Sequence, residues 1–144
     1  MKKLSLLAVI LLVISSCTYS ASLTSMNKAQ VVAMFQNKTI TTIPLATMNG
    51  GLVTDTLTMY LDKKGQIDGQ FASKPANDLQ VDRGVWKVNA EGILCASWDH
   101  WNQGNKICVA VYDLKNAIVF VNTKTGKFES MVLKENIVAG KKMS

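Results

Sequence analysis

Residues 84–112 decide the fold, and they read GVWKVNAEGILCASWDHWNQGNKICVAVY. Two runs rich in β-branched and aromatic residues flank a polar loop, which is the pattern of two strands joined in a hairpin. Each run carries one cysteine, Cys95 or Cys108. If these cysteines face each other, the register sets three further pairs: Leu94 with Val109, Ala96 with Ile107, and Trp98 with Asn105.

Strand alternation in that register sorts the side chains of the hairpin onto two faces. One face would carry only apolar side chains: Leu94, Ala96, Trp98, Ile107, Val109 and Val111. The two cysteines would lie together on the opposite face. The hairpin is therefore expected to present one wall to a hydrophobic core and a disulfide to the other side.

The same pattern of short apolar runs separated by turns continues along most of the chain. It predicts strands at 38–43, 54–61, 66–71, 84–88, 92–98, 106–112, 117–122 and 127–133. Tight turns with Gly or Asn at a position suited to positive φ are expected at 62–65, 89–92, 113–116 and 123–126. Because such turns leave no room for a crossover helix, the strands must be antiparallel neighbours. The predicted fold is mainly β, a meander forming a small open or closed barrel, with a flat sandwich as the alternative.

One helix is expected before the strands, over residues 23–36, with Thr24 or Ser25 capping its amino end. Its apolar residues recur near helical spacing, so that one side can lie against the sheet. We interpret this helix as a cover for one end of the barrel.

The amino terminus has the layout of a signal peptide. Lys2 and Lys3 precede an apolar run at 4–14, which is too short for a permanent transmembrane helix of about 20 residues. The run ends in Ile14, Ser15, Ser16 and Cys17. The alternative to a lipoprotein signal is an ordinary secretory signal with a chance cysteine at the cleavage point.

These last four residues resemble the lipobox of bacterial lipoprotein precursors. The resemblance implies cleavage before Cys17, a diacylglycerol on its thiol and, in most Gram-negative bacteria, a third acyl chain on its amine. It divides the chain into a signal peptide (1–16), a lipidated tether (17–22) and a single β-rich domain (23–144). Two or more acyl chains hold a protein stably at a membrane. With Thr18 in place of the inner-membrane retention signal Asp, the expected location is the cell envelope, at the outer membrane facing the periplasm.

The cysteine count is consistent with this interpretation. Of three cysteines, lipidation of Cys17 leaves one pair, Cys95 and Cys108, and a disulfide persists in an exported protein. Two thiols and a single histidine do not complete a four-ligand zinc site, so neither a metal nor another cofactor is expected.

The charge pattern argues against nucleic acid as a partner. The precursor carries 16 basic and 10 acidic side chains, and loss of Lys2 and Lys3 leaves 14 basic ones. The lysines are scattered and Arg83 is the one arginine, so no stripe of positive charge is available to neutralise phosphates.

A second resemblance rests on the glycine, tryptophan and cysteine positions of 84–112: Gly84, Trp86, Val88, Gly92, Leu94, Cys95, Trp98 and Cys108. This pattern is similar to small exported bacterial domains of unknown function. The resemblance implies an envelope β-domain with a cysteine pair, and it implies no activity.

The candidate binding loop consists of Asp99, His100, Trp101 and Asn102. Exposed aromatic rings flanked by amides and carboxylates suit contacts with a protein or a glycan. The competing interpretation is a solvated hairpin loop whose Trp101 covers the barrel mouth. No activated nucleophile accompanies His100 and its neighbour Asp99, so catalysis is not expected.

The remaining candidates are read as structural. Trp86 is expected in the core, and the methionines Met26, Met34, Met48 and Met59 in packing positions. Most of the six aspartates considered are expected in turns as local hydrogen-bond acceptors; the six are Asp55, Asp62, Asp68, Asp78, Asp82 and Asp99.

The functional expectation is a non-enzymatic binding or interaction module that engages a protein, a glycan or a small apolar ligand. One alternative is a structural lipoprotein for envelope assembly, which predicts an exposed apolar patch and no cavity. The other is a hydrolase, which predicts two carboxylates facing each other in a cleft near His100.

Overall fold

The computed structural model describes residues 23–44, 46–48, 51–53, 55–73 and 79–143. The expectations for the signal peptide 1–16, the tether 17–22 with Cys17, and Asp78 lie outside the described residues. So does the side chain of Met48. No helix in the described ranges has the length and apolar content needed to cross a membrane.

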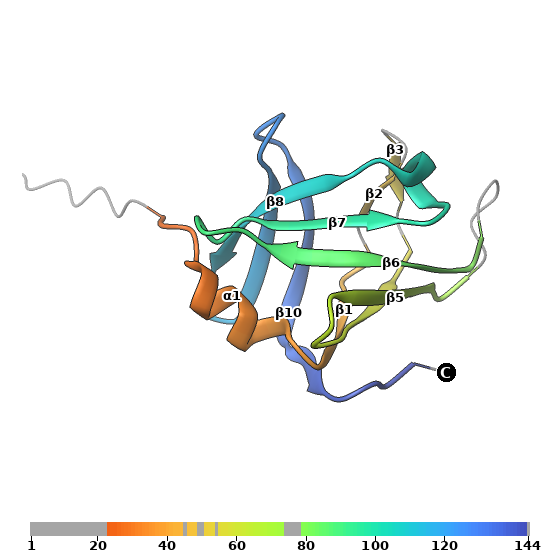
Figure 1. The fold of residues 1–144 in the computed structure, drawn as a ribbon, viewed down its shortest axis with the longest axis horizontal. Coiled ribbons are helices and arrows are strands. Elements are labelled where there is room, and N and C mark those ends of the chain that lie inside the picture. The colour runs from red at the N-terminus through yellow and green to blue at the C-terminus, as the bar shows by residue number, and fades with distance from the viewer. Residues whose placement is uncertain (1–22, 45, 49–50, 54, 74–78, 144) are drawn as a thin grey trace, which may run out of the picture.

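Eight antiparallel strands close into a barrel (Figure 1). In chain order they are β1 (Lys38–Thr42), β4 (Leu57–Leu61), β5 (Gln66–Phe71), β6 (Val81–Val88), β7 (Leu94–Trp98), β8 (Ile107–Asp113), β9 (Ala117–Asn122) and β10 (Phe128–Ala139). Neighbours in sequence are neighbours in the barrel from β4 to β10, and β1 pairs with both β10 and β4. The predicted meander is therefore confirmed in its closed form, and the flat sandwich is wrong.

A small separate hairpin lies between the first two barrel strands in sequence. It pairs β2 (Ala46–Met48) with β3 (Gly51–Val53), and the sequence analysis did not predict it. The predicted strand 54–61 is correspondingly shorter, because β4 begins at Leu57.

Two other strands are longer than predicted. β6 begins at Val81 instead of 84, and β10 runs on from 133 to Ala139. β10 pairs with β9 over residues 128–133 and with β1 over residues 132–139. Its register with β1 shifts between Ile40 and Thr42, where the extra residues lie in β10. This shared strand is what closes the barrel.

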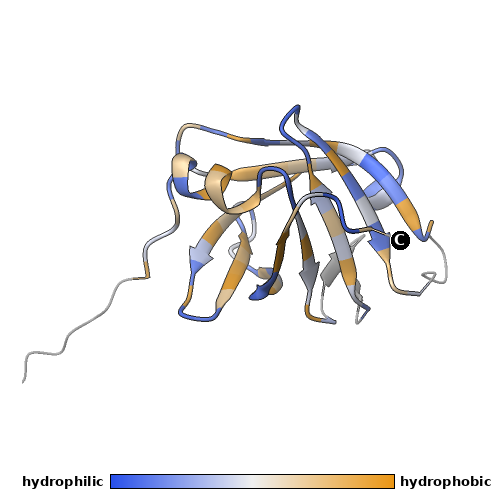
Figure 2. Ribbon diagram, turned by 90° about the horizontal axis from the view of Figure 1, so that it is seen from below, coloured by the Kyte–Doolittle hydropathy of each residue, from blue (hydrophilic) through white to orange (hydrophobic). Residues whose placement is uncertain are grey.

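Hydrophobic and hydrophilic residues alternate along the barrel strands (Figure 2). In β6, Asp82, Gly84 and Trp86 are buried, whereas the residues between them are exposed. The core that results combines aliphatic side chains from every barrel strand with Trp86, Trp98 and Trp101. Trp86 thus lies in the core, as predicted.

Helix α1 (Lys28–Phe35) covers one end of the barrel (Figure 1). Val31 and Phe35 point into the core and are fully buried, and the Phe35 ring lies 5.6 Å from that of Phe120. The helix ends before Asn37, whose φ of 56° is left-handed and turns the chain into β1. The predicted cover is therefore present.

The start of the helix is later than predicted, and the caps Thr24 and Ser25 are wrong. Ser25 forms an isolated bridge with Tyr112, and Met26 N donates to Val111 O at 2.7 Å. These contacts keep the chain extended against β8. Asn27 then caps the helix through a capping box, in which Asn27 Oδ1 accepts from Gln30 N and Gln30 Oε1 accepts from Asn27 N.

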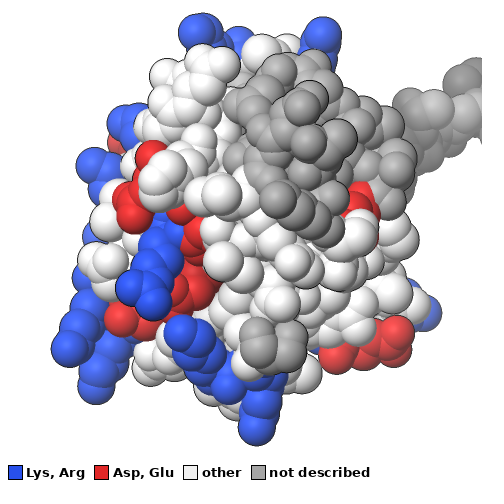
Figure 3. Space-filling view, turned by 90° about the vertical axis from the view of Figure 1, so that its right-hand side faces the viewer, with Lys and Arg blue, Asp and Glu red and all other residues white. Residues whose placement is uncertain are grey.

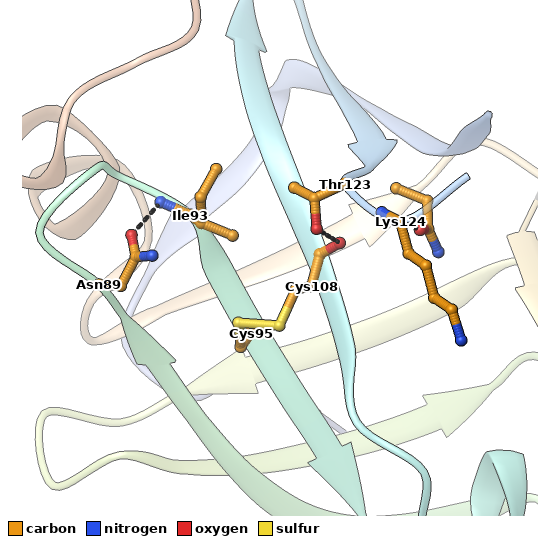
Figure 4. The surroundings of a disulfide bond; sticks show 7 residues. Asn89, Ile93, Cys95, Cys108, Thr123 and Lys124 are labelled. Atoms are coloured by element: carbon orange, nitrogen blue, oxygen red, sulfur yellow. Dashed lines mark hydrogen bonds between the residues drawn. A yellow bond between two sulfur atoms is a disulfide. The ribbon is translucent and has the colours of Figure 1, made fainter. Parts of the chain in front are cut away.

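The decisive hairpin has the predicted register. Cys95 lies opposite Cys108 and is bonded to it (Figure 4). Leu94 lies opposite Val109, and Ala96 lies opposite Ile107. The ladder ends there, so the predicted pair of Trp98 with Asn105 does not form. On the other side of β7, Trp98 pairs with Gly84 of β6. After Trp98 the chain enters the short 3₁₀ segment η1 (Trp101–Gly104).

Three of the predicted turns carry a glycine with positive φ: Gly65, Gly92 and Gly126. Gly92 also lies against the helix start, because a Cβ there would contact the backbone of Met26 and Asn27. The fourth turn, 113–116, is wrong in this detail, since Asn116 is not among the described residues with positive φ.

Candidate functional site

The interior of the barrel holds a partly open cavity of about 120 Å³. All eight strands contribute side chains to its wall, and almost all of these are apolar. The inner face predicted for the hairpin is part of this wall, through Leu94, Ala96, Trp98, Ile107 and Val109. All three tryptophans of the chain line the same space. The interior is therefore a mainly apolar, aromatic-rich chamber.

Within the described part of the chain, polar residues line the cavity at only three positions: Asn102 of η1, and Glu129 and Ser130 of β10. Both segments belong to the end of the barrel opposite α1, because η1 follows β7 and the β9–β10 turn precedes Glu129. The chamber thus has an apolar body and a polar end. Nothing in the sequence analysis singled out Glu129 or Ser130.

Glu129 is held in place by a neutral partner. Its Oε1 accepts from Asn122 Nδ2 at 2.5 Å, and Asn122 Oδ1 in turn accepts from Lys124 N and Thr125 N in the adjacent turn. Among the described side chains, no lysine, arginine or histidine forms an ion pair with Glu129.

Trp101 is the most buried side chain of the predicted binding loop. It is 0% exposed, and its ring packs 4.8 Å from Phe71 and 4.8 Å from Trp98. Its indole Nε1 donates to Leu79 O at 2.7 Å, which satisfies the one polar atom of the side chain. The prediction of an exposed aromatic at this position is wrong. Trp101 instead covers the barrel at its polar end, which was the competing interpretation.

Asp82 anchors the loop that carries Trp101. Its carboxylate accepts from Trp101 N at 2.7 Å, His100 N at 2.9 Å and His100 Nδ1 at 2.9 Å. Burial raises the pKa of the Asp82 carboxyl, but the hydrogen bonds from Trp101, His100 and Arg83 outweigh this effect and lower the pKa. The expected turn position of Asp82 is wrong, since it lies in β6 with a side chain only 2% exposed.

The remaining loop residues divide between surface and cavity. Asp99, the predicted neighbour of the histidine, is exposed, and it is Asp82 that pairs with His100. Asn102 has a left-handed φ of 54°, and its Nδ2 donates to Asn105 O at 3.1 Å. Of the four predicted loop residues, the structure brings Trp101 and Asn102 to the cavity, while Asp99 and His100 face outward.

A second hollow lies outside the barrel wall, beside His100. Basic and acidic side chains alternate around it: Asp68, Asp82, Arg83, Asp99, His100 and Lys141. Asp68 forms ion pairs with Arg83 at 3.4 Å and with Lys141 at 2.8 Å. Figure 3 shows basic and acidic side chains interleaved on one side of this end of the molecule. The carboxylate of Asp68 is thus engaged with two cations, and that of Asp82 with donors of the His100–Trp101 segment.

The remaining candidates among the described aspartates and methionines have structural roles, the former in turns and the latter in packing. Asp62 accepts from Lys64 N and Gln66 N, and Asp55 accepts from Thr56 N and Ser73 N, as expected for turn residues. Met26 is buried in the core, Met34 packs against it, and Met59 lines the cavity. Within the described ranges, no three His, Cys, Asp or Glu side chains form a group that could hold a metal ion.

The chain matches no protein-family model, no curated protein and no solved structure with which it was compared.

Proposed function

We propose that this protein is a lipid-anchored lipoprotein of the cell envelope whose barrel binds a small apolar ligand without catalysing a reaction. The observation that carries the proposal is the apolar cavity of about 120 Å³ inside the barrel. An engineered apolar cavity of about 150 Å³ stays dry and binds benzene, so a cavity of this size accepts a molecule of roughly six carbon atoms.

Energetics favour a binding role for this space. An enclosed empty apolar cavity costs about 24 cal/mol per Å³, so a partly open volume of 120 Å³ corresponds to at most roughly 3 kcal/mol. That is a sizeable share of a stability that is typically about 5–15 kcal/mol. A ligand that fills the cavity recovers part of this cost. A purely structural lipoprotein gains nothing from the cavity, and the binding module is preferred for that reason.

The carboxylates near His100 do not have the arrangement that a hydrolase needs. Asp82 is committed to three donors of the His100–Trp101 segment, and Asp68 to two cations. Neither is arranged as a free acid or base toward the cavity. The support for binding thus comes from the interior of the barrel.

The ligand-binding part of the proposal is tested with 1-hexanol as a neutral probe, followed by tryptophan emission. Because every tryptophan of the chain lines the cavity, a bound probe should change the emission. We expect a dissociation constant on the order of a millimolar or below, from burial of about six methylene-sized groups.

A cavity-filling variant supplies the control. Ala96→Leu places a larger side chain in the cavity and should abolish the response. Ala110→Leu makes the same change on β8 at a residue that does not line the cavity, and it should bind as the unaltered protein does. Equal binding by both variants, or no response to hexanol in the parent protein, would refute ligand binding in the barrel.

The anchor is supported by the lipobox-like residues before Cys17 and by the disulfide that occupies the other two thiols. Expression of the full precursor in a Gram-negative host tests it. We expect an outer-membrane protein whose mass corresponds to a chain that begins at an acylated Cys17. Cys17→Ser should move the protein to the soluble fraction, whereas Thr18→Ala should leave it membrane-bound. A mature protein without acyl chains would refute the anchor.

A further inference from the structure

We infer that the ligand of the barrel carries a cationic head, a primary ammonium or a group of similar chemistry, which binds the Glu129 carboxylate at the polar end of the cavity. This inference rests on the proposed function and narrows it to one ligand class. Its basis is a local departure of β10 from regular strand geometry.

A bulge at Glu129 turns two consecutive side chains of β10 toward the cavity. Phe128 lies opposite Val121, whereas Ser130 lies opposite Phe120, so β10 has one extra residue at position 129. Consecutive side chains of a regular strand point to opposite faces. Here Glu129 and Ser130 both line the cavity. Bulges of this kind commonly aim a side chain at a binding or catalytic site.

If hydrophobic burial alone decided the orientation of these residues, the aromatic side chain would face the cavity and the charged one would face the solvent. The bulge produces the opposite arrangement. The aromatic Phe128 is 37% exposed, while its charged neighbour Glu129 is half-buried and faces the cavity. Turning a carboxylate toward an apolar chamber is unfavourable unless a partner compensates for the charge. This choice of residues is explained by a ligand that supplies the compensation.

No described protein group supplies that compensation. The one hydrogen bond to the Glu129 carboxylate in the described structure comes from the neutral amide of Asn122. The Asn122 side chain is itself held by hydrogen bonds from the 123–126 turn to its Oδ1. It therefore orients the Glu129 carboxylate without neutralising its charge. Asn122 is therefore a positioning residue, and Glu129 is the group that contacts the ligand.

The rest of the cavity wall fits an ammonium head on an apolar body. Among the residues that the structure describes, no lysine, arginine or histidine lines the cavity, and Glu129 is the one charged residue that does. Asn102 and Ser130 supply neutral hydrogen-bonding groups at the same end, and the indole rings of Trp98 and Trp101 offer π faces that attract cations. A ligand ending in a carboxylate would meet a like charge there.

Three probes with the same alkyl chain separate the contribution of the head from that of the cavity. Hexylammonium, 1-hexanol and hexanoate are titrated at pH 7 into the full mature protein, and binding is measured by calorimetry. We expect hexylammonium to bind about tenfold to a hundredfold more tightly than hexanoate, which is the effect of one hydrogen bond to a charged group. Hexanol should bind with intermediate affinity.

Glu129→Gln keeps the shape of the side chain and removes its charge. This variant should lose the preference for hexylammonium while it still binds hexanol. Glu135→Gln is the matched control, because residue 135 lies on the same strand but is exposed and away from the cavity, and it should keep the full preference.

The outcomes distinguish this inference from the proposed function. The inference of a cationic head is wrong if hexanol binds but hexylammonium binds no more tightly than hexanol. It is also wrong if Glu129→Gln still binds hexylammonium more tightly than hexanol. In both cases the apolar cavity remains a binding site. If none of the three probes binds, the proposed binding function fails as well. A preference that disappears in Glu129→Gln and persists in Glu135→Gln establishes the head group.

Discussion

Asp82 and His100 are joined by two hydrogen bonds, one from the backbone N–H of His100 and one from its Nδ1, each at 2.9 Å. The pKa of Asp82 is lowered, so its carboxylate is ionised and can only accept hydrogen bonds near neutral pH. His100 Nδ1 must therefore carry a hydrogen and donate a hydrogen bond to the carboxylate. Together with the bond from Trp101 N, this contact fixes the segment that covers the polar end of the barrel.

Asp82→Asn should therefore destabilise the fold at pH 7, by about 1–3 kcal/mol, because charge-assisted hydrogen bonds are replaced by weaker ones. A carboxyl whose folded pKa is lowered contributes stability above its unfolded pKa of about 3.9. That contribution is lost as the pH falls through the folded pKa. Urea unfolding of both proteins from pH 7 to pH 2 should show the difference shrinking below about pH 4.

Asp99→Asn is the control for this comparison, since Asp99 is exposed beside the same loop and should change stability by less than about 0.5 kcal/mol. The quantity to compare is the difference in unfolding free energy between the parent protein and each variant. The Asp55 carboxyl also has a lowered pKa, caused first by its hydrogen bond from the Ser73 hydroxyl, and it contributes to the pH dependence of all three proteins. A gap between parent and Asp82→Asn that stays constant down to pH 2 would contradict the assigned role.

Gly69→Ala should destabilise the barrel because the position has no room for a side chain. A Cβ there would lie 2.5 Å from Trp101 Cζ3 and 2.6 Å from Trp98 Cη2. Overpacking of this kind costs about 1–3 kcal/mol. The measurement is the free energy of unfolding in a double-mutant cycle with Trp101→Leu. The cost of the alanine should fall when the smaller side chain leaves space, and strictly additive effects would argue against this contact.

The barrel is predictable from sequence because its determinants are local. Turn glycines such as Gly65 and Gly126 and the alternation in runs such as 117–122 each specify one strand or one reversal, and tight turns leave one way to connect them. The register of the decisive hairpin follows from two cysteines alone. The β2–β3 hairpin was missed although the pair Asn49–Gly50 between its strands is a strong hairpin signal.

The candidate site is less predictable because it depends on contacts distant in sequence. The partner of His100 is Asp82, 18 residues away, and not the adjacent Asp99. The burial of Trp101 depends on Gly69, Phe71 and Leu79, none of which carries a local signal for it. The bulge at Glu129 is a matter of pairing between β9 and β10, so strand alternation alone does not reveal that residues 129 and 130 share a face.

Asn27→Ala should weaken the helix that covers the opposite end of the barrel. It removes the acceptor for Gln30 N and half of the capping box, at a cost of about 0.5–2 kcal/mol. Thermal unfolding monitored by circular dichroism should show a lower midpoint. Ser25→Ala should leave the midpoint nearly unchanged, because Ser25 pairs with Tyr112 through a backbone bridge. Equal effects of the two substitutions would point to a helix start earlier than Asn27.

Loss of the disulfide should lower the stability of the barrel without changing its architecture. The bond joins residues 13 positions apart on adjacent strands, and closing a loop of this length contributes about 3 kcal/mol. The strands β7 and β8 are also joined by their backbone ladder, and their inner face is packed in the core. A Cys95→Ala, Cys108→Ala protein should therefore fold, with an unfolding midpoint at a lower urea concentration. Reductant should shift the parent protein to the same midpoint and leave the double variant unmoved, whereas a variant as stable as the oxidised parent would show that the ladder and the core alone hold this hairpin.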